Sequence, residues 1–251
     1  MNRTVSKFGE SDLRDMFSLA ASIDAAELAR EYAVQGRVQI APFLGGDGAA
    51  FLARHLLART DWNFTLNSDD RTYEVPRHGV TAMSPEQEYR LRNAVEGKAV
   101  AEFQFCYDSI RVPDVRAERD MVDPLHCFAE FMSSGPVLAL MREITENAEI
   151  GFADAQATIY RNRDFLTAHD DAVAGKQRVA AYVLGLTAEW RTEWGGLLMF
   201  HDSRGDVERA LIPRFNTLTM FRVPKVHSVS AVAAAAARPR CSITGWLRKS
   251  Q

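Results

Sequence analysis

The sequence predicts a mainly β (α+β) protein, an antiparallel sandwich or barrel supported by helices. Two observations carry this prediction. The first half of the chain shows helical spacing of apolar residues at several places. From about residue 153 onward the pattern changes to eight short alternating segments separated by turn residues. Short strands at this density, after a helix-rich half, are typical of a closed or layered antiparallel sheet with helices packed on it.

Length and composition indicate one globular domain. The chain has 251 residues, of which 47% are hydrophobic and 25% charged, and its formal net charge is −3. This charge provides no basic surface for a phosphate backbone, so we expect no nucleic-acid partner. We expect a single domain over residues 1–251, with an N-terminal arm over 1–22, a helix-rich supporting region over 23–150 and a β-rich core over 151–251.

The cysteines and the apolar runs indicate the cellular compartment in which the protein is expected. Cys106, Cys127 and Cys241 stand singly and form no CxxC pair, so we expect buried thiols in a reducing environment. No apolar run reaches the length of a membrane span, and the N-terminal residues lack the apolar centre of a signal peptide. A cytoplasmic protein without membrane contact is expected.

Capping and turn residues place the elements of the first half. Gly36 is a C-cap glycine, Ser84 is an N-cap followed by proline at the first helical position, and residues 133–136 (Ser-Ser-Gly-Pro) can break a helix. His55 lies on a mostly apolar helix face and is expected to pack there rather than bind metal. The expected helices cover 12–21, 24–35, 47–59, 84–96 and 124–145, the last as one helix or two, and the expected strands cover 37–43, 62–66, 71–75 and 103–107.

The second half is expected to be strands joined by short turns. An alanine run over 233–237 is expected to form a loop or a short helical turn before Pro239. The eight expected strands cover 155–160, 165–171, 178–186, 196–201, 208–212, 217–222, 227–232 and 242–247.

A histidine and a carboxylate two residues apart end one of these segments. If the segment is extended, His169 and Asp171 point to the same face and Asp170 points away. Of the six histidines, His169 alone has a carboxylate at the second following position. Two imidazoles and one carboxylate on one face of an ion leave other positions open, which is the arrangement of non-haem Fe(II) oxygenases. The pair therefore predicts a metal site that needs a third ligand.

Two later residues can complete such a site. His227, within an apolar stretch, is the candidate third ligand, and the alternative is a buried histidine satisfied by a backbone carbonyl. Arg240 enters the last apolar strand, where a guanidinium is costly to bury without an anion and matches a carboxylate in shape. The alternative is an arginine at the rim. Arg238 competes for the anion, but Arg240 shares one strand face with Ser242 and Thr244.

Five elements follow one another in the second half of the chain: His169-x-Asp171, Gly195–Phe200, Pro213–Leu218, His227–Val229 and Arg240–Trp246. Together and in this order they resemble the 2-oxoglutarate/Fe(II)-dependent dioxygenases, specifically their prolyl 4-hydroxylase-like branch. The resemblance covers about residue 153 to the C-terminus, and the first half matches only as a supporting region. Relatives that repair nucleic acid carry a second arginine where this chain has Trp246.

The resemblance implies a fold and a metal. The core over 151–251 would be a double-stranded β-helix (jelly roll, cupin-like), with the helix-rich N-terminal half packed on it. His169, Asp171 and His227 would hold Fe(II) and form the catalytic centre. 2-Oxoglutarate and O2 would be the co-substrates, and ascorbate a stimulant.

The resemblance also implies a co-substrate site. Arg240 would bind the distal carboxylate of 2-oxoglutarate, assisted by Ser242 or Thr244. Tyr160, nine residues before His169, resembles a tyrosine that such enzymes place near the co-substrate. The alternative for Tyr160 is an ordinary aromatic residue of a strand.

The implied activity is hydroxylation of an unactivated C–H bond with release of succinate and CO2. The expected substrate is a prolyl or similar residue of a protein or peptide, or a free amino acid. One alternative is an oxygenase of another small metabolite, and another is a jelly-roll module that binds metal without turnover. Segments 67–77 and 108–123 are the candidate lid or groove segments that would decide between a long open groove and a closed pocket, and the alternative for both is a plain solvated loop. No oligomeric state is predicted.

Overall fold

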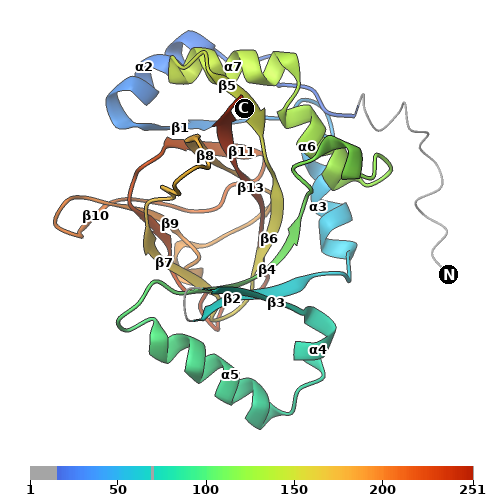
Figure 1. Cartoon of the computed structure of the whole chain (residues 1–251), viewed down its shortest axis with the longest axis vertical. Helices are drawn as coiled ribbons and strands as arrows, with labels where there is room; N and C mark the ends of the chain where they lie inside the picture. The colour runs from blue at the N-terminus through green and yellow to red at the C-terminus, as the bar shows by residue number, and fades with distance from the viewer. Residues whose placement is uncertain (1–15, 69–70, 251) are drawn as a thin grey trace.

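The strands join in one curled antiparallel sheet in the computed structural model, which describes residues 16–68 and 71–250 (Figure 1). The strands are β1 (Arg37–Ile40), β2 (Asn63–Ser68), β3 (Arg71–Pro76), β4 (Phe105–Arg111), β5 (Ile150–Ala153), β6 (Gln156–Tyr160), β7 (Phe165–His169), β8 (Arg178–Gly185), β9 (Leu198–His201), β10 (Val207–Leu211), β11 (Thr217–Arg222), β12 (His227–Val229) and β13 (Arg240–Lys249). All eight strands expected in the second half are present, so that prediction is confirmed.

The order of the strands gives the sheet two layers. One layer runs β1-β11-β8-β13-β6-β4, and the other runs β7-β12-β9-β10. β4 pairs with both β6 and β7 and so joins the layers, while β2 and β3 extend the sheet beside β4. This is the expected double-stranded β-helix, with an interior open between the layers.

Four helices cover the outer face of the first layer. They are α2 (Ala25–Gln35), α3 (Gly48–Ala58), α6 (Pro124–Met132) and α7 (Gly135–Thr145), and they surround the upper and right-hand sides of the sheet in Figure 1. Period-two alternation explains the packing: the odd-numbered Cys241 and Ile243 of β13 lie in the apolar core under these helices. Their even-numbered neighbours face the interior, which makes β13 a strand with one structural and one functional face.

A separate layer covers β2 and β4. The short α4 (Arg77–Thr81) and the longer α5 (Pro85–Lys98) pack on a second core that contains Phe64, Val95 and Cys106. Ser84 caps α5 through a reciprocal capping box with Gln87. None of the helices within residues 16–68 and 71–250 is long and apolar enough to cross a membrane.

The predicted boundaries differ from the structure at several places. Of the helix expected over 12–21, residues 12–15 lie outside the described residues and residues 16–21 form turns and an isolated bridge. α5 passes through Gly97, because a glycine inside a helix is tolerated when flanking residues favour the helix. The break near residue 134 is confirmed as the α6–α7 junction, and the alanine run forms turns. α4 and β5 were not predicted.

Candidate metal and co-substrate site

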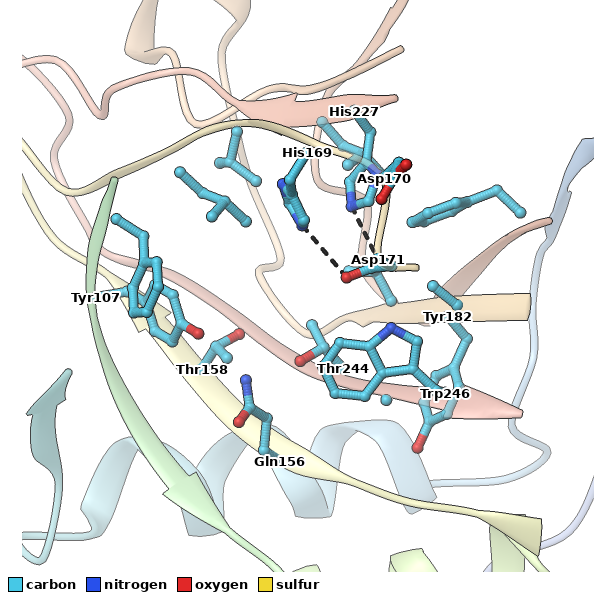
Figure 2. A pocket seen from close by; sticks show the side chains of 18 of the residues that line it. Tyr107, Gln156, Thr158, His169, Asp170, Asp171, Tyr182, His227, Thr244 and Trp246 are labelled. Carbon is cyan, nitrogen blue, oxygen red and sulfur yellow. Dashed lines mark ion pairs between the residues drawn. The ribbon is translucent and has the colours of Figure 1, made fainter. Parts of the chain in front are cut away.

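Two histidines and a carboxylate meet at one end of the interior. His169 ends β7 and His227 begins β12, and these residues face each other in the register of the two strands. His169 Nε2 lies 3.3 Å from Asp171 Oδ1, and His227 Nε2 lies 3.4 Å from Asp171 Oδ2 (dashed lines in Figure 2). One ligand atom from each residue falls within 4.8 Å of the others, so the three can bind one metal ion.

Backbone carbonyls hold both imidazoles in the tautomer that a metal needs. His169 Nδ1 lies 3.0 Å from the carbonyl oxygen of Thr167, and His227 Nδ1 lies 2.8 Å from that of Lys225. A proton on each Nδ1 leaves the lone pair of Nε2 free for a metal. Burial, with His169 nearby, lowers the pKa of His227 to about 4, so this ring is neutral near neutral pH.

Asp171 reaches the site by a route that strand alternation did not predict. β7 ends at His169, and Asp171 has a left-handed backbone with φ of 64°. The expectation of an extended segment through residue 171 is therefore wrong, although the two side chains do converge. Burial acts to raise the pKa of Asp171, but the two histidines lower it overall, so this carboxyl group is ionised. Asp170 instead accepts a hydrogen bond from the backbone of Ala172.

The three residues border a cavity of about 440 Å³ inside the jelly roll. Its size is that of a small-molecule site. Figure 2 shows polar side chains across the cavity from His169 and His227, including Tyr107, Gln156, Thr158 and Thr244. Trp246 lies below Asp171 in the same view. The cavity therefore offers a metal site on one wall and hydrogen-bonding groups on the other.

Arg240 lines the same cavity and has no protein anion as a partner. Its side chain is buried, with 3% of the residue exposed, and its Nε and Nη1 atoms have no hydrogen-bond partner among the described residues. The guanidinium lies 5.1 Å from the centre of the Tyr160 ring. Burial lowers the pKa of Arg240, as expected for a cation without a counter-charge. An unpaired buried guanidinium fits a carboxylate ligand such as that of 2-oxoglutarate.

The other residues expected near the co-substrate, Tyr160, Ser242 and Thr244, line two different cavities. Tyr160 and Thr244 line the main cavity. Ser242 is fully buried, lies 2.9 Å from the Thr158 hydroxyl and borders a separate small cavity behind Arg240. Thr158, its register partner on β6, lines the main cavity, and the role of Ser242 beside the co-substrate stays a prediction.

Arg238, the competing candidate for the anion, and His55 lie outside the site. Arg238 is half-exposed and pairs with Glu189 at 3.1 Å, so it does not enter the cavity. His55 lies 3.4 Å from Asp123 in an ion pair between helices, away from the candidate metal ligands. The three cysteines are buried and none forms a disulfide, as expected.

The polar cavity residues that were not predicted include Tyr107, Gln156 and Thr158. The alternation of β6 held a usable signal, because Gln156 and Thr158 precede Tyr160 at period two. Tyr107 comes from β4, fifty-three residues before Tyr160, and stacks on it at 5.1 Å. That contact depends on the β4–β6 pairing, which no local pattern encodes.

Two glycines stand in the loop before β9. Gly195 and Gly196 both have positive φ, and a Cβ on Gly195 would collide with the carbonyl oxygen of Ala231. A Cβ on Gly196 would also press on the side chains of Val232 and Trp190. The Gly-Gly pair therefore lets the loop before β9 pass close to Arg240.

Comparison with known proteins gives consistent matches. Residues 155–248 match the family model of the 2OG-Fe(II) oxygenase superfamily. Over 100 residues, which are 37% of this chain, the sequence is 33% identical to prolyl 3-hydroxylase OGFOD1 of Xenopus laevis. The match spans 19% of that relative, so the chain corresponds to about a fifth of its length.

Two solved structures share the fold. A prolyl-4-hydroxylase of Pseudomonas putida superposes with a TM-score of 0.58 and 18% identity, covering 91% of this chain and 100% of the other. A prolyl hydroxylase of Trichoplax adhaerens, solved with a hypoxia-inducible-factor peptide fragment, superposes with a TM-score of 0.60 and 14% identity, covering 90% and 89%. The superpositions include the helix-rich half, which the sequence motifs did not cover.

Proposed function

We propose that this chain, which belongs to the 2OG-Fe(II) oxygenase superfamily through residues 155–248, hydroxylates a prolyl or similar residue of a protein or peptide, or a free amino acid. One observation carries the proposal. The unpaired, buried Arg240 opens into the same cavity as His169, Asp171 and His227. A metal-binding module without turnover has no use for a second, anion-binding group in that cavity.

The residues divide the chemistry between them. His169, Asp171 and His227 would hold Fe(II) and leave its other positions free. Arg240 would fix the distal carboxylate of 2-oxoglutarate. When bound, the metal and the co-substrate supply O2 activation, with 2-oxoglutarate converted to succinate and CO2 and one oxygen atom transferred to the substrate.

The wall of the cavity contributes orientation and shielding. Tyr107 and Tyr160 stack along one side, and burial raises the pKa of both phenols, so they remain neutral hydrogen-bond donors. Thr158 and Thr244 add hydroxyl groups to the cavity that Arg240 also lines. Leu166, Leu198 and Phe221 belong to the apolar part of the lining. The apolar residues limit water near the reacting C–H bond.

The shape of the site supports an extended substrate. The cavity-facing side of β6 continues through paired residues of β4 and β2 to the edge strand β3, where Thr72 is exposed and also lines the cavity. A cavity whose lining reaches an exposed edge strand supports a peptide more than an enclosed metabolite. Two similar proteins are prolyl hydroxylases by name and one was solved with a peptide, which supports the same substrate class.

Succinate formation tests the proposal. The purified protein is incubated with Fe(II), 2-oxoglutarate, ascorbate and O2, with and without a library of proline-containing peptides. We expect oxygen-dependent succinate release that peptides increase, and product peptides heavier by one oxygen atom. Free proline and other amino acids form a parallel arm. If no succinate forms and 2-oxoglutarate causes no thermal shift, the chain is a metal-binding module instead.

A further inference from the structure

Asp171 has a backbone conformation that needs support. Its φ of 64° lies in the left-handed region, which a residue with a Cβ adopts less readily than glycine. The hydrogen bond from Ala172 to Asp170 shapes the turn but does not contact Asp171. The position of the carboxylate therefore depends on contacts made to Asp171 from elsewhere in the fold.

Arg178, at the start of β8, makes such contacts. Its Nη1 donates a hydrogen bond of 3.0 Å to the main-chain carbonyl oxygen of Asp171 and lies 3.8 Å from Oδ1 of the same residue. One guanidinium thus holds both the peptide unit and the carboxylate. The Arg178 side chain is 15% exposed, and its Nε atom has no hydrogen-bond partner among the described residues.

Trp246 determines where this guanidinium lies. The Arg178 guanidinium carbon is 3.5 Å from the centre of the Trp246 ring system, a close stacking contact. The backbone N–H of Trp246 donates a 2.7 Å hydrogen bond to Asp154, which fixes this part of β13. Figure 2 shows the indole nitrogen directed towards Asp171, and this nitrogen has no hydrogen-bond partner among the described residues.

We propose that Arg178, stacked on Trp246, is a positioning residue that holds Asp171 in its left-handed conformation so that the carboxylate faces His169 and His227. This inference rests on the proposed function, because it takes Asp171 as a metal ligand. A planar guanidinium is required, since it stacks on the indole and donates in a fixed direction. A lysine ammonium has the charge but neither property.

Metal affinity tests this role without depending on turnover. Metal-free protein is titrated with Mn(II) by calorimetry for the wild type and for Asp171→Ala, Arg178→Ala and Arg178→Lys. We expect Arg178→Ala to bind Mn(II) about 10–100-fold more weakly, the range for residues that orient metal ligands. Arg178→Lys should recover only a small part of this loss. Trp246→Phe, which keeps an aromatic face, should bind more tightly than Trp246→Ala.

Arg111→Ala is the matched control. Arg111 is a second arginine on the same side of the sheet, but it pairs with Glu74 at 2.7 Å and does not contact Asp171, so its loss should leave Mn(II) affinity unchanged. Circular dichroism and thermal unfolding verify that each variant is folded. If Arg178→Ala does not fold, Arg178→Lys and Trp246→Ala answer the same question.

The outcomes separate this inference from the proposed function. If wild type and Asp171→Ala bind Mn(II) equally, the metal site itself is wrong. If Asp171→Ala loses binding while folded Arg178 variants bind like the wild type, the positioning role is wrong and the metal site stands. Wild-type Mn(II) affinity with a raised KM for the peptide alone would make Arg178 a substrate-contacting residue and would also overturn the inference.

Discussion

Arg92 and Arg240 are both buried, but their surroundings differ. Arg92 in α5 is 5% exposed, and its Nη1 lies 2.6 Å from Asp164, whose carboxylate also accepts the backbone N–H of Arg161. Arg240 is 3% exposed and has no carboxylate partner within residues 16–68 and 71–250. The first charge is neutralised by the protein and ties α5 to the sheet. The second is left for a ligand, so the presence or absence of a protein counter-charge distinguishes these two buried arginines.

Removing a metal ligand should have the largest effect on succinate formation, the reaction for which Arg240 is proposed to bind the co-substrate. His169→Ala or Asp171→Ala should lower succinate formation by about a thousand-fold or more, because the metal contributes several kcal/mol to such reactions. Iron content and succinate release measure the two effects. His55→Ala, a histidine outside the site, is the control and should stay active. Near-normal turnover of either ligand variant would refute the ligand assignment.

Removing the charge of Arg92 should damage the fold rather than the chemistry. Arg92→Met leaves the Asp164 carboxylate buried without its cation, so we expect a loss of about 3–5 kcal/mol in the free energy of unfolding. Denaturant titration measures it. Arg240→Met is the matched variant in the other region, and without 2-oxoglutarate it should be as stable as the wild type or more stable. Equal destabilisation by both changes would remove the distinction between the two regions.

Arg240→Met should instead weaken co-substrate binding. Loss of a charged hydrogen-bond partner worth about 1.5–3 kcal/mol predicts 2-oxoglutarate binding weaker by about 10–100-fold, with metal binding kept. Calorimetry on the Mn(II)-loaded protein measures both affinities. Arg238→Met is the control, because that side chain pairs with Glu189 at the surface. If Arg238→Met weakened binding and Arg240→Met did not, the wrong arginine would have been assigned.

The predictable parts of the site are those with local patterns. His169 and Asp171 are close in sequence, and Arg240 and Thr244 share a strand face, so period-two reasoning could bring each pair together. The same reasoning was wrong about the backbone of Asp171, since alternation does not say where a strand ends. It also could not find the Thr158 hydroxyl beside Ser242, because that hydroxyl belongs to another strand.

The rest depends on long-range pairing. Arg178 was expected only as the first residue of a strand, and its stacking on Trp246 joins β8 to β13 across sixty-eight residues. Tyr107 and the Arg92–Asp164 pair likewise depend on β4 and α5 packing against the core. Strand alternation and helix caps predicted most elements because they are local, whereas these contacts exist only once the sheet has closed.

The smallest predicted effect is a pH dependence that sharpens the contrast between the two arginines. Burial raises the pKa of Asp164 from 3.8 to about 6, and the charge of Arg92 limits the rise. A carboxyl group with a higher pKa in the folded state binds more protons there, so stability falls as pH rises from 3.8 through the folded pKa. Arg92→Met should raise the pKa of Asp164 in the folded state above 6, so the fall in stability should extend to higher pH.

The difference in the free energy of unfolding between the wild type and Arg92→Met should therefore grow above pH 6, by up to about 1 kcal/mol per pH unit. Below pH 6 the difference should be smallest, because Asp164 is protonated in both folded proteins. Denaturant titrations across this range measure the difference between variant and wild type. Adding Asp164→Asn to Arg92→Met should abolish the pH dependence, because no buried carboxylate remains. Arg240→Met, which leaves no carboxylate unpaired, should show no comparable trend. A parallel trend in that variant would mean that Arg240, like Arg92, neutralises an anionic group of the protein.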